Sequence, residues 1–376
     1  MIMIICKFCK SNQLKKILSL GSTPLANSYV VKYQDFKFEK SYALELHLCK
    51  KCKLIQAPHN INPNKIFVNY DYLSGISSTW IEHCRKFYSR VTKKFKFKPK
   101  NDTIVEIASN DGTLLKFFVK NKFKCIGIEP SKFAVKIAQK NQVNTVNKFL
   151  EPKLAKKIKK KNKNISLVVA NNVIAHVLDI NNFIKSLSIL CSQDTILSIE
   201  FPHVVNLFKK LQYDTVYHEH HYYYSLESIQ NLLREYDLQI FDIDKLNIHG
   251  GSLRVYARKN NNKLNKSKKL VQEIKKEKRL NLYSDKNLKK FQISVKKTKQ
   301  NAIQYLNKLK DKNSKISVYG AAAKGNTFLN YCNINHKTID FAYDNNRLKQ
   351  GKYLPGSKIK ILNPVMIKKY KPNFII

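Results

Sequence analysis

Four short apolar runs, each followed by a helical pattern, constrain the fold of this 376-residue chain more than any other feature. The runs are TIVEIA (103–108), KCIGIE (124–129), SLVVAN (166–171) and TILSIE (195–200). Short continuous apolar runs that alternate with amphipathic helices are typical of buried parallel strands. The sequence therefore predicts an α/β fold with a doubly wound, Rossmann-like domain. LRVYARK (253–259) is expected to add a later strand to the same sheet.

The chain is predicted to divide into five segments. Residues 1–60 hold two CxxC pairs, and 61–100 form a connector with a Tyr- and Ser-rich patch (69–80) and an amphipathic helix over 81–91. Residues 101–258 form the cofactor-binding domain, 259–312 a Lys-rich helical linker, and 313–376 a second Rossmann-like unit with strands in KISVYG and TIDFAYD. The chain stops at KPNFII, itself strand-like, so this last unit is expected to be truncated.

Two CxxC pairs indicate a metal centre near the N-terminus. Cys6 and Cys9 form the first pair, and Cys49 and Cys52 form the second. Four thiolates complete the tetrahedral coordination of Zn²⁺ and leave no open position, so the predicted zinc is structural. The alternative is that these are independent buried or redox-active cysteines. The other cysteines occur singly and are expected to pack in the core.

Three strand ends carry candidate cofactor ligands. Glu106 lies inside the first strand, and the turn that follows consists of Ala108, Ser109, Asn110, Asp111 and Gly112. Rossmann-type methyltransferases seat the methionine part of S-adenosylmethionine on such a turn, and Gly112 is expected to let the backbone approach the ligand closely. Glu129 follows the second strand, where an acid accepts hydrogen bonds from ribose hydroxyls. Asn171 and Asn172 follow the third, and Phe149 either covers the adenine or packs in the core.

The segment YDTVYHEHHYYYSL (213–226) concentrates groups that can move protons, including His218, Glu219 and His220. Methylation of a carbon next to a carbonyl needs a base for the α proton and donors for the enolate oxygen, and neutral His and Tyr supply both. Two alternatives stay open. The run could ligate a metal, although only His218 and His220 would share one side of a strand, or it could be a packed aromatic cluster without chemistry.

The formal net charge of +44 raises a different class of function. Lysines predominate and are spread along the chain, with denser runs at 93–100, 152–164 and 259–279. Nucleic-acid readers favour Arg for bidentate contacts, so these runs are expected to be solvated helix faces. A zinc-ribbon nucleic-acid-binding protein is the alternative, but it leaves Glu106, Glu129 and the His-rich segment unexplained.

Location and partners follow from what the sequence lacks. No apolar run reaches the ~18 residues of a membrane span, and a CxxC pair takes the place of a signal peptide's apolar core. We therefore expect a cytoplasmic monomer or small homo-oligomer, with neither membrane nor nucleic acid as a partner.

Further motifs extend the pattern over nearly the whole chain, in the order CKFC, STPLANSY, LCKKCKLIQ, NYDYLSGISSTW, EIASNDGTLL, GIEPSKFA, NNVIAHVLD, YDTVYHEHHYYYSL, HGGSLRVYA and YGAAAKGNTFLNY. This order resembles that of the S-adenosylmethionine-dependent deoxysugar C-methyltransferases of the tetronitrose, mycarose and noviose pathways. The resemblance implies a class I Rossmann-like methyltransferase domain between an N-terminal zinc-binding module and a C-terminal Rossmann-like unit.

The resemblance also implies a reaction and roles for individual residues. The expected substrate is a nucleotide sugar, a TDP-linked 4-keto-deoxysugar, methylated at C3 with release of S-adenosylhomocysteine. On the YHEH motif the base is His220. The other residues that the resemblance places at the sugar are Tyr217, Glu219, Tyr70 or Tyr72, and His176.

The sequence departs from this family at three points. Ala108 stands where Gly is common, a change expected to be harmless because both are small. His203 follows EFP where Tyr is frequent, which removes one expected substrate contact. The early end of the chain raises a third interpretation of its function, a catalytically silent scaffold.

The segment GAAAKG (320–325), with Asp344 further on, also resembles an NAD-binding turn. The alternative is that this turn has a structural role or contacts the nucleotide sugar.

Overall fold

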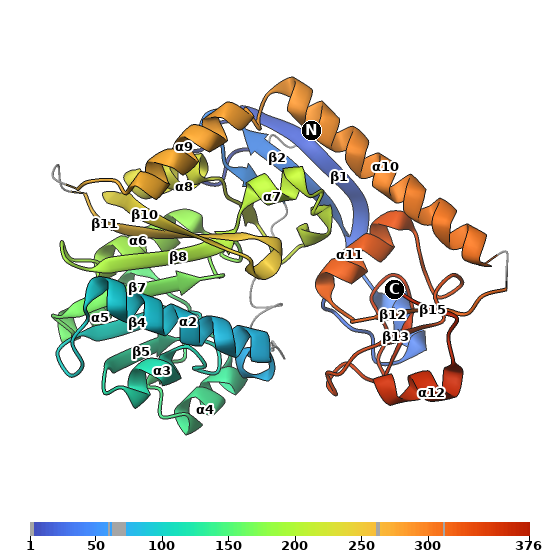
Figure 1. The fold of residues 1–376 in the computed structure, drawn as a ribbon, viewed down its shortest axis with the longest axis horizontal. Coiled ribbons are helices and arrows are strands. Elements are labelled where there is room, and N and C mark those ends of the chain that lie inside the picture. Colours follow the sequence, from blue (N-terminus) through green and yellow to red (C-terminus); the bar gives the residue numbers. More distant parts are fainter. Residues whose placement is uncertain (1–3, 59–60, 62–72, 261–263, 311–312) are drawn as a thin grey trace.

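A computed structural model describes residues 4–58, 61, 73–260, 264–310 and 313–376. The described strands form three sheets (Figure 1). A seven-stranded sheet occupies the middle of the chain, a four-stranded antiparallel sheet the N-terminal part, and a four-stranded parallel sheet the C-terminal part. The predicted α/β fold class with two Rossmann-like units is confirmed.

The central sheet has the strand order β10-β11-β8-β7-β4-β5-β6. Its strands are β4 (Thr103–Ile107), β5 (Lys124–Ile128), β6 (Thr145–Val146), β7 (Ile165–Asn171), β8 (Ile196–Pro202), β10 (Leu238–Leu246) and β11 (Ser252–Lys259). β11 pairs antiparallel with both β10 and β8, and the other pairs in the sheet are parallel. Every residue of β4 is buried, as expected for a parallel strand covered on both faces. The five predicted strands are all present, whereas β6 and β10 were not predicted.

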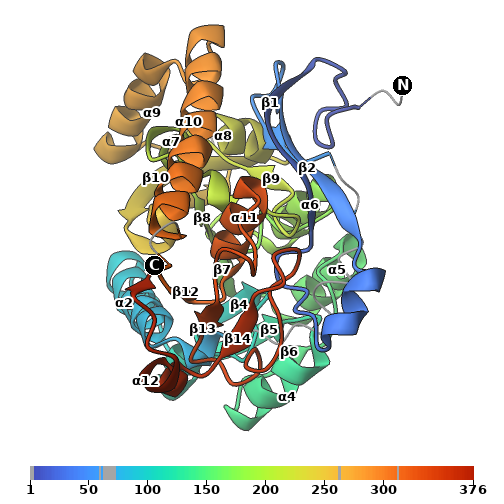
Figure 2. The ribbon, with the colours of Figure 1, turned by 90° about the vertical axis from the view of Figure 1, so that its right-hand side faces the viewer.

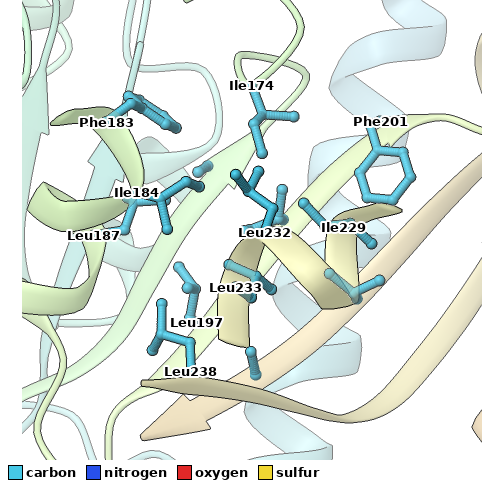
Figure 3. Close-up of a cluster of buried hydrophobic side chains, with 14 of the residues drawn as sticks. Ile174, Phe183, Ile184, Leu187, Leu197, Phe201, Ile229, Leu232, Leu233 and Leu238 are labelled. Atoms are coloured by element: carbon cyan, nitrogen blue, oxygen red, sulfur yellow. The ribbon is translucent and has the colours of Figure 1, made fainter. Parts of the chain in front are cut away.

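Helices cover both faces of this sheet. One face packs against α2 (Ser78–Phe95), α3 (Leu115–Lys120) and α4 (Lys132–Lys140). The other packs against α5 (Pro152–Lys161), α6 (Ile180–Leu190) and α8 (Leu226–Arg234). Figure 3 shows the second core, where Ile184 and Leu187 of α6 and Leu232 of α8 gather around Leu197 of β8. Short polar side chains begin the helices: the Ser77 hydroxyl, for example, accepts from the Trp80 N–H of α2.

The N-terminal sheet has the order β1-β2-β3-β9 and draws one strand from a distant part of the chain. Its strands are β1 (Leu14–Pro24), β2 (Ser41–Cys49), β3 (Ile55–Gln56) and β9 (Tyr222–Tyr223). β3 pairs with β9 through Ile55 opposite Tyr223 and Gln56 opposite Tyr222. The cysteine-rich part of the chain and the His-rich segment are therefore parts of one sheet.

Two long helices connect the central sheet to the C-terminal unit. They are α9 (Lys268–Leu280) and α10 (Asp285–Lys310), and α10 contacts β1, where the Gln292 amide donates to the Ile17 carbonyl at 3.1 Å. No described helix, α10 included, has both the length and the apolar character needed to cross a membrane. Shorter helical segments are η1 (Tyr33–Phe38), η2 (Ser74–Ile76), α7 (Val204–Lys209), η3 (Tyr213–Thr215) and η4 (Ile248–Gly250).

The C-terminal unit has the parallel order β14-β13-β12-β15 and faces the viewer in Figure 2, in front of the central sheet. Its elements are β12 (Ile316–Tyr319), α11 (Ala323–Cys332), β13 (Phe341–Tyr343), β14 (Lys360–Leu362), η5 (Pro364–Met366), α12 (Ile367–Tyr370) and β15 (Phe374–Ile375). The predicted strand at KPNFII pairs with β12 at the edge of the sheet. The five-segment division of the chain remains a prediction. The segments are not separate in space, because β9 of the central segment belongs to the N-terminal sheet.

Candidate active site and zinc centre

A cavity of 1420 Å³ lies at the carboxyl ends of β4, β5, β7 and β8. Open α/β sheets bind ligands at this edge, because the loops that leave the strand ends form a crevice there. Four parts of the chain line it: residues 25 and 27–29 after β1, residues between 73 and 80 before and in α2, the strand ends and loops of the central domain, and residues 322–324 with others between 346 and 352 of the C-terminal unit. Segments next to all three sheets therefore contribute to its wall.

The turn after β4 has a left-handed backbone at three positions: φ is 55° at Ala108, 50° at Asn110 and 78° at Gly112. An alanine in the left-handed conformation costs about 1 kcal/mol. A glycine at position 108 would relieve this strain, so alanine and glycine are not equivalent there although both are small. A Cβ on Gly112 would lie 2.8 Å from Val143 Cγ2. The positive φ and the packing against Val143 each favour a glycine at 112. The expectation that Gly112 lets the backbone approach a ligand stays a prediction.

Two buried acids face the cavity from neighbouring strands. Oε2 of Glu106 is buried without a hydrogen-bond partner among the described residues. Desolvation, with the charges of Asp111 and Glu129, raises the pKa of Glu106 well above its usual value. Glu129 accepts from the backbone N–H groups of Asn110 at 3.0 Å and Ser131 at 2.8 Å, yet burial still raises its pKa. Acids that are hard to ionise alone favour a ligand that brings positive charge.

Asn172, with φ at 55°, presents a third acceptor to the cavity. Its Nδ2 donates to Glu200 Oε1 at 3.0 Å, and because a carboxylate only accepts, this bond fixes the amide orientation. Oδ1 of Asn172 is then buried without a partner among the described residues. Burial alone would raise the pKa of Glu200, but the charge of Arg254, 2.6 Å away, and the hydrogen bond with His83 lower it to about 2. This buried cluster could not be anticipated from the sequence pattern.

These groups fit S-adenosylmethionine, which is cationic and carries ribose hydroxyls. The unpartnered acceptors on Glu106 and Asn172 suit its ammonium group, and Phe149 lies on the same cavity with 39% of its surface exposed, which excludes a core role for that ring. The predicted cofactor residues that line the cavity are Glu106, Ala108, Ser109, Asn110, Glu129, Asn171 and Asn172.

Asp111 and Gly112 do not line the cavity. The Asp111 carboxylate accepts from the Gly75 N–H at 2.7 Å and from the Thr113 hydroxyl at 2.6 Å, and Asn110 Oδ1 accepts from the Ser74 N–H at 2.9 Å. Both side chains therefore hold the connector before α2 against the cofactor turn. The cofactor contact predicted for Asp111 has no support in this arrangement.

The His-rich segment forms a turn over 217–220, where the His220 N–H donates to the Tyr217 carbonyl at 2.9 Å. His220 Nδ1 lies 3.0 Å from the Thr215 carbonyl, so Nδ1 carries the proton and Nε2 is the acceptor. The Tyr217 hydroxyl lies 3.0 Å from that Nε2. Desolvation, with the charges of His176, His249 and Lys324, lowers the pKa of His220 well below its usual value. His220 is thus a neutral imidazole on the cavity wall, poised to accept a proton.

Glu219 and His176 lie beside this base. The Asn27 amide donates to Glu219 Oε1 at 2.5 Å. The Tyr29 hydroxyl lies 3.2 Å from Asn27 Oδ1 and donates to the Ala321 carbonyl at 2.6 Å. His176 Nδ1 donates to the Glu219 carbonyl at 2.9 Å, and its ring centre lies 4.7 Å from that of His220. Burial lowers the pKa of His176 to about 4. Asn27 and Tyr29 link the base to the C-terminal unit, and the sequence did not single them out.

Other candidate residues lie elsewhere. His218 Nε2 lies 3.1 Å from the Tyr42 carbonyl of β2, on a different side of the turn from His220, so the strand assumed for this run was wrong. The side chain of His203 lies outside the cavity lining, 2.5 Å from Glu277 Oε1, so this arrangement gives no support to a substrate contact at this position. The predicted sugar contacts Tyr70 and Tyr72 lie outside the described residues.

The C-terminal GAAAKG turn is arranged for structure rather than for a dinucleotide. Asp344 Oδ2, which would have to meet a ribose hydroxyl, accepts from the Ala321 N–H at 2.8 Å and pairs with Lys349 at 3.3 Å. The acid is thereby occupied by the turn itself, and the NAD alternative loses its main support.

The four N-terminal cysteines form the zinc centre. Their sulfur atoms all lie within 4.8 Å of one another, with Cys6 3.7 Å from Cys52 and Cys9 3.5 Å from Cys49. Tetrahedral Zn²⁺ with Zn–S bonds of 2.3 Å places its sulfurs about 3.8 Å apart, so the residues fit the metal. In the described part of the chain no other cluster of this kind occurs, which argues against metal ligation by the His-rich run.

Family comparisons match this arrangement along the chain. A family described as "Putative zinc binding domain" matches residues 6–67, "Methyltransferase domain" matches 80–243, and "C-methyltransferase C-terminal domain" matches 247–376. The C-methyltransferase NovU of Streptomyces niveus is 26% identical over 99% of this chain and 88% of its own length. The chain is an S-adenosylmethionine-dependent C-methyltransferase.

Solved structures with similar folds each cover about half of the chain. A SAM-dependent methyltransferase from Anabaena variabilis is 16% identical, with a TM-score of 0.41 over 53% of this chain and 92% of its own. Magnesium protoporphyrin IX methyltransferase from Synechocystis, solved with bound S-adenosylhomocysteine, is 13% identical, with a TM-score of 0.37 over 48% of this chain and 83% of its own.

Replacing one zinc ligand should release the metal. Cys49→Ser is expected to lose most bound zinc and to lower the Tm, because the knuckle that it breaks leads directly into β3. Zinc content by mass spectrometry and thermal denaturation measure both effects. Cys191→Ala removes a buried cysteine far from the cluster and should keep its zinc, and stoichiometric zinc in Cys49→Ser would contradict the assignment.

Neutralising the buried acid of the cofactor turn should weaken cofactor binding. Glu106→Gln keeps the shape but removes the charge, so we expect the Kd for S-adenosylhomocysteine to rise roughly 10- to 100-fold, the value of one charged hydrogen bond. Isothermal titration measures this affinity. Glu82→Gln, at the surface of α2, is the matched control, and equal affinities in both variants would remove Glu106 from the cofactor site.

Proposed function

We propose that this C-methyltransferase acts on the carbon next to a ketone in a nucleotide-linked 4-keto-deoxysugar, at C3, with TDP as the expected nucleotide. The observation that carries the proposal is the shared cavity: His220 lines the same cavity as Glu106 and Glu129. A base and a cofactor site that meet in one cavity suit a reaction in which a proton leaves a carbon that then receives a methyl group.

The proposed base is His220. Its proton on Nδ1 is held by the Thr215 carbonyl, so Nε2 is free of its own proton and can take the α proton of the sugar. The low pKa keeps the imidazole neutral at pH 7, and Tyr217 and His176 flank it. When bound, S-adenosylmethionine supplies a methyl group on a sulfonium centre.

A nucleotide is supported by the charge on the opposite wall. Lys324, Lys349 and Lys352 line the cavity from the C-terminal unit. Lys349 is paired with Asp344, whereas neither Lys324 nor Lys352 forms an ion pair with a described residue. Two unpaired cations facing the cavity suit the diphosphate of a nucleotide sugar. The sugar-contacting roles of Glu219, Tyr217, His176 and one of Tyr70 or Tyr72 are part of this proposal, as are the other cofactor contacts.

The resemblance of the chain to the deoxysugar C-methyltransferases supports the sugar as methyl acceptor. The likeness to the C-methyltransferase NovU extends over almost the whole chain and includes the C-terminal family match. This argues for a complete catalytic arrangement over a silent scaffold. A cytoplasmic location and a monomer or small homo-oligomer remain predictions.

The reaction is tested by release of S-adenosylhomocysteine in the presence of TDP-4-keto-6-deoxyglucose or a related 4-keto sugar. We expect turnover with the wild-type protein and none with the 4-hydroxy counterpart, which has no acidic α carbon. His220→Ala should lose turnover by roughly 10²- to 10⁴-fold, the usual contribution of a general base, while its affinity for S-adenosylhomocysteine stays unchanged.

His336→Ala is the matched control, since His336 lies in the C-terminal unit away from the cavity. Methylation of the 4-hydroxy sugar at the wild-type rate would contradict a mechanism through an enolate. Wild-type turnover in His220→Ala would remove this residue from the role of base.

A further inference from the structure

The HGG motif at 249–251 holds the most unusual backbone on the cavity wall. Three consecutive residues have positive φ: 52° at His249, 81° at Gly250 and 118° at Gly251. Glycine adopts such angles freely, but a histidine does so at a cost of about 1–2 kcal/mol. Strained residues of this kind persist where the surrounding structure fixes them, and they concentrate at functional sites.

The surrounding structure fixes this loop from several sides. The Gly250 carbonyl accepts from the Gln212 amide at 3.0 Å and from Lys210 at 3.1 Å. The Gly251 carbonyl accepts from the Asn206 amide at 2.9 Å and from the His203 N–H at 3.1 Å. A Cβ at Gly250 or Gly251 would lie 2.3 or 2.4 Å from these amide groups and would displace them, and the positive φ would strain any other residue at either position.

The side chain of His249 is exposed on the cavity wall and makes no hydrogen bond with a residue in the described part of the chain. Of the three histidines that line the cavity, His176 and His220 each have Nδ1 bonded to a backbone carbonyl. Neither ring nitrogen of His249 forms a hydrogen bond with any residue in the described part of the chain. Its ring instead lies against Trp80 of α2, with centres 5.7 Å apart. Both nitrogens are therefore available to a molecule in the cavity.

Other residues with a left-handed backbone also line this cavity, although most of those in the described part of the chain lie elsewhere. Among the non-glycine residues with positive φ, those lining the cavity are Ala108, Asn110, Asn172 and His249. The first three surround the proposed cofactor contacts. His249 lies within η4, in the loop between β10 and β11, which is a different segment of the chain from the cofactor turn.

The charge state of His249 suits a hydrogen-bond donor. Desolvation on the cavity wall lowers the pKa of His249, and the charges of Lys324 and His83 act in the same direction against the opposing charge of Glu200. The ring is neutral at pH 7 and carries one N–H. A neutral imidazole can polarise a carbonyl without giving up its proton.

We propose that His249 is a further catalytic residue, which donates a hydrogen bond from its imidazole to the ketone oxygen of the substrate while His220 removes the α proton. The assignment rests on the proposed function. The proton moves from carbon to His220 Nε2, the electron pair of the C–H bond becomes the carbon–carbon double bond, and the carbonyl π electrons move to oxygen. His249 then stabilises that oxyanion, and no other reactant is needed.

Two variants separate this role from a structural one. His249→Gly adopts the same φ without strain and removes the ring, and His249→Asn tolerates a left-handed φ and offers a shorter donor. Loss of an oxyanion donor lowers kcat by roughly 10²- to 10³-fold. We expect kcat of His249→Gly to fall by about that factor with little change in KM. The same variant should keep its Tm and its affinity for S-adenosylhomocysteine. His249→Asn should recover part of the lost kcat.

The assay is methyl transfer to the 4-keto sugar, together with exchange of the substrate's α proton in D₂O in the presence of S-adenosylhomocysteine, which isolates enolisation. Both rates should fall together in His249→Gly, with His336→Ala as control. Wild-type rates in His249→Gly would overturn the proposal, as would loss of the fold in both variants. If the wild-type protein neither exchanges nor methylates the sugar, the proposed function fails and this role fails with it.

Discussion

The pairing of β3 with β9 is the interaction on which the arrangement of the active site depends. The second cysteine knuckle ends at Cys52, β3 begins three residues later, and its Ile55 lies opposite Tyr223. The contact continues where the Ala57 N–H donates to the His221 carbonyl at 2.9 Å and the His221 N–H donates to the Ala175 carbonyl at 2.7 Å. One short ladder therefore links the zinc centre to the segments that carry His220 and His176. Because the strands are only two residues long, the zinc centre is what can hold this ladder in register.

The wall of the cavity carries both signs of charge. Buried acids line it at the ends of β4 and β5, and lysines line it from the C-terminal unit and, as Lys148 and Lys153, from the central domain. Both signs suit a cationic cofactor together with the anionic nucleotide that we propose. Other lysines face solvent, such as Lys156 and Lys157 of α5, as expected for a basic run on a helix surface.

The sequence predicted those features that depend on local pattern. Buried strands show as apolar runs, and the polar residue at the end of each strand shows where the ligand edge lies, so Glu106, Glu129 and Asn172 could be found without a structure. The four cysteines could be found from spacing alone. Ser109 and Asn110 could be found from the same turn. The packing of Gly112 against Val143 and the bond from the Gly75 N–H to Asp111 could not, because these partners are distant in sequence.

The remaining features depend on contacts that spacing cannot reveal. Asn27 meets Glu219 and Arg254 meets Glu200 only once the sheets are assembled. Two-residue strands such as β3 and β9 leave almost no pattern in the sequence. The predicted strand over the His-rich run is therefore limited to β9, and residues 217–220 before it form a turn. The positive φ of His249 is equally invisible in the sequence, and so are the bonds from the amides of Gln212 and Asn206 to the neighbouring Gly250 and Gly251.

The central claim is methyl transfer to a sugar carbon. The most direct measurement incubates the protein with S-adenosylmethionine labelled with ¹³C in its methyl group and a TDP-4-keto-6-deoxy sugar, and locates the label by carbon–proton correlation NMR. We predict a methyl group bonded to C3, next to the ketone. A label on oxygen or nitrogen, or none transferred by a folded, zinc-loaded protein that binds S-adenosylhomocysteine, would contradict the account.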